Sequence, residues 1–312
     1  MRSIARSDAL SLAALMCLAL TVLAGTSPEF EQLAKLFAYD PSAPLTFQVD
    51  GRDAAGGATI LAVSYAGAMA PVSATIVVPS PAGKHPAVVF MTDSGHKRDY
   101  FLAEALKLAE AQPPAVSLLI DPPPMRPLGW RRSFNPMLDD NDRDTHIQAV
   151  IDVRRGVDLL MARADVDARL IGYVGQSDAA NWGAILSSIE PRLHAFVLIA
   201  GYPNLTGPTM SDDPEWADLR YALGHDRFDR YVASMSAIDP VKYLGHSAGV
   251  PILFQVGRFD PYISRARADE LVHAAGRSGH AIFYDSGHEV NDPRALTDRG
   301  SFLAARIGTG KK

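Results

Sequence analysis

Continuous apolar runs alternate with amphipathic segments along most of the chain. Four short runs are apolar at nearly every position, as is typical of strands buried on both faces of a sheet: residues 87–91, 116–120, 195–200 and 252–256. Four further segments have the spacing of amphipathic helices: residues 100–111, 144–163, 264–275 and 294–306. This alternation predicts an α/β fold with a mostly parallel central sheet and helices on both faces.

An antiparallel pattern precedes these runs. Three β-prone segments are separated by turns that contain Gly or Pro, which predicts an antiparallel meander: residues 45–49, 58–64 and 72–78. A short amphipathic helix is predicted before them at 30–37, and Asp40-Pro41 ends it.

The segment 169–182 predicts a strand, a tight turn and a helix, with Ser177 at the apex of the turn. Such a sharp turn leaves no room for bulky neighbours, and Gly175 meets this need because it has no Cβ. Ala179 meets the same need less fully on the other side. The backbone N–H of the residue after Ser177 lies at a helix N-terminus, where it suits a developing oxyanion.

An aspartate and a histidine follow two later strands. Asp260 comes after the apolar run 252–256, and His288 comes after a further predicted strand at 281–284. The carboxyl ends of parallel strands meet at one edge of a sheet, so these side chains are predicted to lie near Ser177. His288 would then accept the proton of Ser177, and Asp260 would orient the imidazole. Taken singly, each residue is equally compatible with a helix cap, a turn or the surface; Asp285 and Asp292 are poorer candidates for the acid.

Residues 37–305 resemble the α/β-hydrolases of the dienelactone-hydrolase and prolyl-oligopeptidase-like group, which includes acetyl-xylan-esterase-like enzymes. The similar segments are the approach to the serine turn and the loops of the acid and histidine: residues 152–160, 165–167, 171–175, 251–260 and 287–289. The resemblance implies the α/β-hydrolase fold, with Ser177, Asp260 and His288 as catalytic triad. It also implies hydrolysis of a small-molecule carboxylic ester or related acyl bond, with no cofactor.

The loop after the run 87–91 departs from this group, which usually carries a His-Gly pair and further glycines there. The matching positions read Thr92-Asp93-Ser94-Gly95. The oxyanion hole uses backbone N–H groups, so the expected donors are Asp178 together with Asp93 or Ser94. The carboxylate of Asp93 would bring a negative charge near the developing oxyanion.

The alternation lapses between residues 201 and 249. Two short helices rich in aromatic residues are predicted at 214–223 and 228–236. They predict a small cap at about 203–247 inserted over the active site; the alternative is that these surface helices bury their aromatics locally. Candidate pocket residues are His96, Trp182, Tyr202 and Trp216, although the position of Trp182 also suits core packing.

Charge and histidine spacing narrow the range of partners. The 312 residues carry a formal net charge of −5 with no basic cluster in the body of the chain, so no nucleic-acid partner is expected. The remaining histidines lack the spacing of metal ligands, and no metal site is predicted. The only cysteine is Cys17, so no disulfide can form within the chain.

The amino terminus has the pattern of a signal peptide. Arg2 and Arg6 precede an almost uninterrupted apolar run at 9–24, and small residues follow it. Residues 1–25 are therefore predicted to direct secretion or periplasmic export, which leaves 26–312 as one hydrolase domain with no membrane contact. Alternatives are a retained membrane anchor or a cytoplasmic protein with a misassigned start.

The sequence favours a secreted serine esterase. A prolyl-oligopeptidase-like peptidase is an alternative enzyme class, and a catalytically inert binding protein on the same scaffold is an alternative of another kind. The acyl group, the alcohol and the oligomeric state stay open.

Overall fold

The computed structural model of the protein describes residues 27–93, 95–126, 138–207 and 214–309. The predicted signal peptide and Ser94 lie outside the described residues. Within those described ranges, no helix is both long and apolar enough to cross a membrane.

In the described residues, nine strands form a single sheet in the order β1-β2-β3-β5-β4-β6-β7-β8-β9. Strands β1, β2 and β3 pair antiparallel, and β3 is also antiparallel to β5. All the remaining pairs, among β5, β4, β6, β7, β8 and β9, are parallel. The strands are β1 Gln48–Ala55, β2 Ala58–Ala66, β3 Pro71–Pro79, β4 His85–Met91, β5 Val116–Ile120, β6 Val166–Gln176, β7 Ala195–Ile199, β8 Ile252–Gly257 and β9 Gly279–Tyr284. The predicted α/β fold with a mostly parallel sheet is confirmed.

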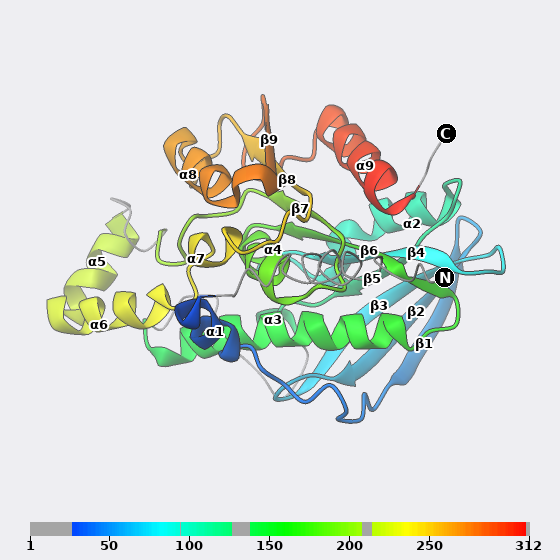
Figure 1. Ribbon diagram of the computed structural model, residues 1–312, viewed down its shortest axis with the longest axis horizontal. Coiled ribbons are helices and arrows are strands. Elements are labelled where there is room, and N and C mark those ends of the chain that lie inside the picture. The colour runs from blue at the N-terminus through cyan, green and yellow to red at the C-terminus, as the bar shows by residue number, and fades with distance from the viewer. Residues whose placement is uncertain (1–26, 94, 127–137, 208–213, 310–312) are drawn as a thin grey trace, which may run out of the picture.

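Helices cover both faces of the sheet (Figure 1). The α-helices are α1 Pro28–Lys35, α2 Leu102–Glu110, α3 Asp140–Met161, α4 Asp178–Ile189, α5 Pro214–Leu223, α6 His225–Ser236, α7 Val241–Leu244, α8 Arg265–Ala275 and α9 Pro293–Ile307. Helices α2 and α9 pack on one face, and α3 and α4 pack on the other. Strands β4, β5, β7 and β8 are buried at every position, as their apolar runs predict.

Two apolar clusters fill the space between the sheet and its two helical layers. Alternate residues of β4 illustrate how one strand serves both: Val89 and Met91 belong to the cluster with α3 and α4, whereas Val88 and Phe90 belong to the cluster with α2 and α9. Because successive side chains of a strand point to opposite faces, a strand between two helical layers must be apolar throughout.

The first strand lies further along the chain than predicted. Strand β1 covers Gln48–Ala55 instead of 45–49, and it pairs with β2 from Gln48 opposite Ser64 to Ala55 opposite Ala58. All but one of its residues are exposed. The prediction was wrong because this edge strand is ordered by its ladder with β2 and has no buried face to impose apolar alternation.

The insertion predicted as a cap contains helices α5, α6 and α7, which follow β7 in the chain. Helix α6 packs on the first turns of α3, where Ser234 donates a hydrogen bond to Asp140 over 2.7 Å. Phe228 and Tyr231 of α6 are buried in the main core, whereas Tyr221 of α5 is 90% exposed. In Figure 1, α5 and α6 extend to one end of the molecule beyond α7. Local burial thus explains why α6 carries aromatic side chains. That the insertion caps the active site stays a prediction.

Candidate active site

Ser177 occupies a strained turn between β6 and α4. Its backbone has φ 59° and ψ −118°, which is uncommon for a residue with a side chain. The N–H of Ser177 donates to the carbonyl of Ile199 in β7 over 2.8 Å, which continues the β6–β7 pairing into the turn. A Cβ built on Gly175 would lie 2.4 Å from the carbonyl oxygen of Ala179, so only glycine fits there without a shift. Strand, turn and helix follow one another as the sequence predicts.

The structure brings the three predicted triad residues together. His288 Nε2 lies 3.0 Å from Ser177 Oγ, and His288 Nδ1 lies 2.8 Å from Asp260 Oδ2. The Asp260 side chain is fully buried, and its other oxygen accepts the N–H groups of Tyr262 at 2.8 Å and Ile263 at 3.1 Å. Both oxygens of this buried carboxylate are therefore hydrogen-bonded, as burial of a charge requires.

Opposing effects act on the pKa of the His288 imidazole. Burial alone lowers the pKa of His288, but the hydrogen bond and the negative charge of Asp260 outweigh it and raise the pKa above its usual value. Glu289 and Asp93 raise the pKa of His288 further through their charges. The site thus stabilises the imidazolium, which is the state that a histidine reaches after accepting a proton.

The two other aspartates weighed for the acid role have different partners. Asp285 forms an exposed ion pair with Arg258 over 2.5 Å. Asp292 caps helix α9, where its side chain accepts the N–H groups of Arg294 and Ala295 at 3.1 Å. Of these aspartates, the structure brings Asp260 into contact with His288.

The loop after β4 lies beside the serine turn because Met91 pairs with Gly175. Thr92 Oγ1 donates to the side-chain oxygen of Gln176, immediately before Ser177, over 3.0 Å. Asp93 Oδ1 accepts the N–H of Gly95 and contacts His96 Nδ1, both at 2.8 Å. The carboxylate of Asp93 therefore stabilises its own turn. Asp178 begins α4, so its N–H lies at a helix N-terminus beside the nucleophile position.

Solved structures named as esterases and as a peptidase share this arrangement of strands and helices. Acetyl xylan esterase 1 from Thermoanaerobacterium is 16% identical with a TM-score of 0.69, over 89% of this chain and 93% of its own. An acetyl xylan esterase from Paenibacillus is 17% identical with a TM-score of 0.72 over the same shares. Acylaminoacyl peptidase from Pyrococcus horikoshii is 12% identical with a TM-score of 0.59, over 85% of this chain and 50% of its own.

The chain has the α/β-hydrolase fold. No family model matches it, and no curated protein matches it in sequence. At identities below one fifth, these structural likenesses establish the fold, and any chemistry of this chain must be argued from its own residues.

The predicted pocket residues lie in different environments. Tyr202 follows β7, and its hydroxyl is 3.4 Å from Ser177 Oγ. Trp182 is only 2% exposed, belongs to the core cluster with α3 and α4, and donates from Nε1 to His146 over 2.9 Å, which fits core packing; its place in the pocket stays a prediction. Trp216 lies on α5, which packs on α6. His96 is half-exposed on the loop after β4, beside the ring of Tyr100.

Two contacts of the loop that carries His288 were not predicted from the sequence. The ring of Tyr262 stands edge-on to His288, with centroids 5.1 Å apart and planes at 83°. Tyr100 donates to Glu289 over 2.5 Å, and burial first, then this carboxylate, raises the pKa of Tyr100. Adjacency to Asp260 and His288 could have indicated Tyr262 and Glu289, whereas Tyr100 precedes Glu289 by 189 residues and gives no local signal.

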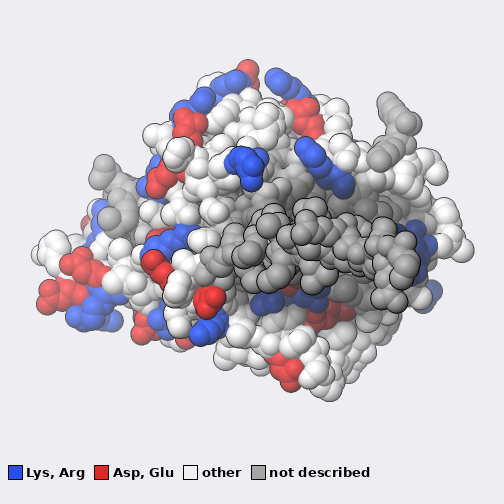
Figure 2. Space-filling view, viewed as in Figure 1, with Lys and Arg blue, Asp and Glu red and all other residues white. Residues whose placement is uncertain are grey.

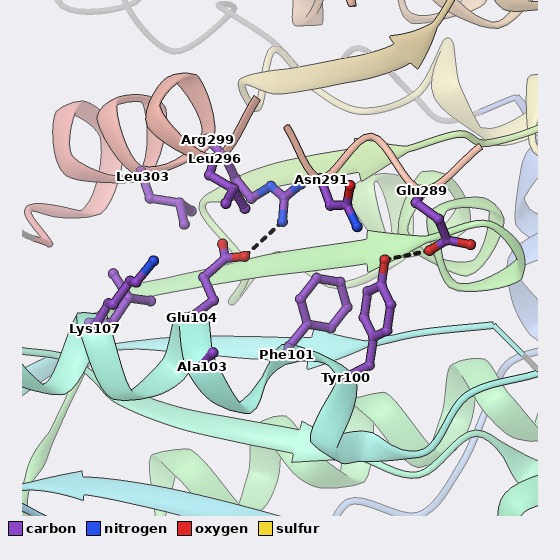
Figure 3. Close-up of a pocket in the computed structure, with 12 residues that line it drawn as sticks. Tyr100, Phe101, Ala103, Glu104, Lys107, Glu289, Asn291, Leu296, Arg299 and Leu303 are labelled. Carbon is purple, nitrogen blue, oxygen red and sulfur yellow. Dashed lines mark hydrogen bonds and ion pairs between the residues drawn. The ribbon is translucent and has the colours of Figure 1, made fainter. Parts of the chain in front are cut away.

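Behind the histidine loop, a cavity of about 340 Å³ lies between α2 and α9. Figure 3 shows Tyr100 and Glu289 meeting at one end of it, with Arg299 and Glu104 paired further along. The lining contains none of the three triad residues. In the described parts of the chain, no group of three or more His, Cys, Asp or Glu has a metal-binding arrangement.

The first testable prediction concerns the serine turn. Gly175→Ala should lower the free energy of unfolding by about 1–3 kcal/mol or more, because the new methyl group overlaps the Ala179 carbonyl. Gly300→Ala is the matched control, since a Cβ there meets nothing within 4 Å in helix α9 and should be neutral or stabilising. Urea unfolding measures both, and equal stability of the two variants would contradict this packing account.

The second prediction concerns the charge beside His288. Glu289→Gln should lower the pKa of His288, because it removes a carboxylate that raises this pKa while keeping an oxygen for Tyr100. The neutral imidazole would then persist to lower pH. NMR titration of the His288 ring tests this directly, with the exposed Glu270→Gln on α8 as control. An unchanged or raised pKa in Glu289→Gln would show that Glu289 does not act on His288.

Proposed function

We propose that this α/β-hydrolase is a serine esterase that cleaves a small-molecule carboxylic ester through an acyl-enzyme. The single observation that carries the proposal is the continuous hydrogen-bonded path from Ser177 Oγ through His288 to Asp260, with contacts of 3.0 Å and 2.8 Å. This is the arrangement needed to remove a proton from a hydroxyl that is otherwise a weak nucleophile.

The proposed reaction has two balanced halves. His288 Nε2 takes the proton of Ser177 as Oγ bonds to the ester carbonyl carbon, and the carbonyl π electrons move onto its oxygen. The tetrahedral intermediate collapses, the bond to the alcohol oxygen breaks, and His288 returns the proton to that oxygen. Water then repeats the sequence on the acyl-enzyme and releases the carboxylic acid. Asp260 fixes the tautomer and stabilises the imidazolium.

Backbone donors are proposed to hold the oxyanion. The N–H of Asp178, at the start of α4, and the N–H of Asp93, in the loop tied to Gln176 through Thr92, lie on the two sides of the serine turn. Ser94 is the further candidate named from the sequence. The turn formed by the Asp93 carboxylate supports an ordered hole, although its charge opposes a developing oxyanion.

Surface charge and the recognition that each substrate class needs bear on which substrate the proposed enzyme would accept. Basic and acidic side chains are interspersed on the coloured part of the face drawn in Figure 2, which presents no continuous basic surface to a polyanion. Peptidase activity would need a site that recognises the amine side of a substrate, and no contact described above provides one. The pattern of residues 1–25 supports export of the mature enzyme.

The third prediction tests the triad as a unit. Ser177→Ala and His288→Ala should each lower kcat for a short-chain ester by roughly 10⁴-fold or more, and Asp260→Asn should lower it by a comparable factor. The double variant Ser177→Ala/His288→Ala should be no slower than either single variant, because the residues act together. Steady-state hydrolysis of 4-nitrophenyl acetate measures these effects.

Ser187→Ala is the matched control. Ser187 lies in the same helix, and its hydroxyl bonds the carbonyl of Ala184 instead of a histidine. It should keep the wild-type rate. Full activity in Ser177→Ala would end the proposed mechanism, and near-normal turnover in Asp260→Asn would remove Asp260 from the role of acid.

A further inference from the structure

Two exposed aromatic rings flank the buried acid of the triad. In the loop between β8 and α8, Phe259 is 71% exposed and Tyr262 is 65% exposed, on either side of Asp260-Pro261. Of the two, Tyr262 contacts the triad.

Tyr262 is fixed relative to the imidazole although its ring faces solvent. Its N–H donates to Asp260 Oδ1 over 2.8 Å, and the other oxygen of the same carboxylate holds His288. Pro261 restricts the backbone immediately before it. The Tyr262 ring lies 5.1 Å from the His288 ring. One carboxylate thus holds both the imidazole and the backbone from which the Tyr262 ring projects.

The reaction chemistry places the alcohol of the substrate near this ring. His288 must return its proton to the leaving oxygen, so the alcohol departs beside His288. Tyr202 also lies close to the imidazole, at 6.4 Å between ring centroids, but it is only 9% exposed. Tyr262 is the ring in contact with His288 that is mostly exposed and therefore accessible to a departing group.

We propose that Tyr262 forms a wall of the leaving-group subsite and that this subsite favours alcohols carrying a ring with an apolar face. The inference rests on the esterase function proposed above. An aromatic ring against an aromatic side chain gains about 0.5–1.5 kcal/mol beyond simple burial, which corresponds to a factor of about 2 to 12. A short alkyl alcohol offers no such face.

The test compares acetate esters that share one acetyl-enzyme and differ in the alcohol. Benzyl acetate and cyclohexylmethyl acetate present an aromatic and a saturated ring, and ethyl acetate presents none. Tyr262→Ala should lower kcat/KM for benzyl acetate about 2- to 12-fold relative to ethyl acetate, and by a smaller factor for cyclohexylmethyl acetate, whose saturated ring gains from apolar burial alone. Tyr262→Phe keeps the ring and should behave as wild type. Tyr221→Ala, at a tyrosine 90% exposed on α5, is the matched control and should change no ratio.

Hydrolysis of the acetyl-enzyme separates this role from damage to the triad. The alcohol has left by that stage, so single-turnover deacylation should be unchanged in Tyr262→Ala. Equal losses for all three esters, or slower deacylation, would show that Tyr262 acts through Asp260 and overturn the proposal. Unchanged ratios would overturn it as well. A wild-type enzyme that hydrolyses none of the esters would refute the proposed function itself, which is a separate result.

Discussion

The conformation of Ser177 depends on constraint from both sides of the turn. A positive φ at a residue with a side chain costs about 1–3 kcal/mol and persists only where the surroundings enforce it. Here β6 is paired with β4 and β7, the Ser177 N–H bonds Ile199, and the buried Tyr173 hydroxyl donates to the Ala179 carbonyl over 2.7 Å. Gly175 permits the close approach of that carbonyl. The Oγ atom is consequently presented at the carboxyl edge, where the loops after β4, β8 and β9 converge.

Electrostatics at this edge follow from the same geometry. The loop after β8 places a fully buried carboxylate at one nitrogen of His288, and the turn after β6 places the Ser177 hydroxyl at the other. Glu289 adds negative charge from the histidine loop, and Asp93 adds it from the loop after β4. These charges favour the imidazolium, yet Asp93 also lies on the side where the oxyanion is proposed to form. If the proposed mechanism holds, the replacement of the usual His-Gly pair by Thr92-Asp93 is expected to change the rate more than the type of reaction.

The sequence predicts best those elements whose own residues carry the cause of their structure. Strands β4, β5, β7 and β8 are buried on both faces and read as apolar runs, and the serine turn needs the glycine that Gly175 supplies. Strand β1 was misplaced because pairing with β2, and not its own pattern, orders it. Trp182 is buried in the core, and its spacing in the helix left core packing and the pocket both open because spacing alone cannot tell which buried surface a tryptophan joins. The bond from Tyr100 to Glu289 depends on the packing of two distant segments.

Covalent labelling of Ser177 tests the central claim most directly. A fluorophosphonate bonds to an activated serine oxygen, and the adduct resembles the tetrahedral intermediate, so labelling requires both the nucleophile and the oxyanion donors. Intact-mass and peptide mass spectrometry should find a single adduct on the peptide containing Ser177, absent from Ser177→Ala and strongly reduced in His288→Ala. Folded wild-type protein that takes up no label, or takes it up at another residue, would contradict the account.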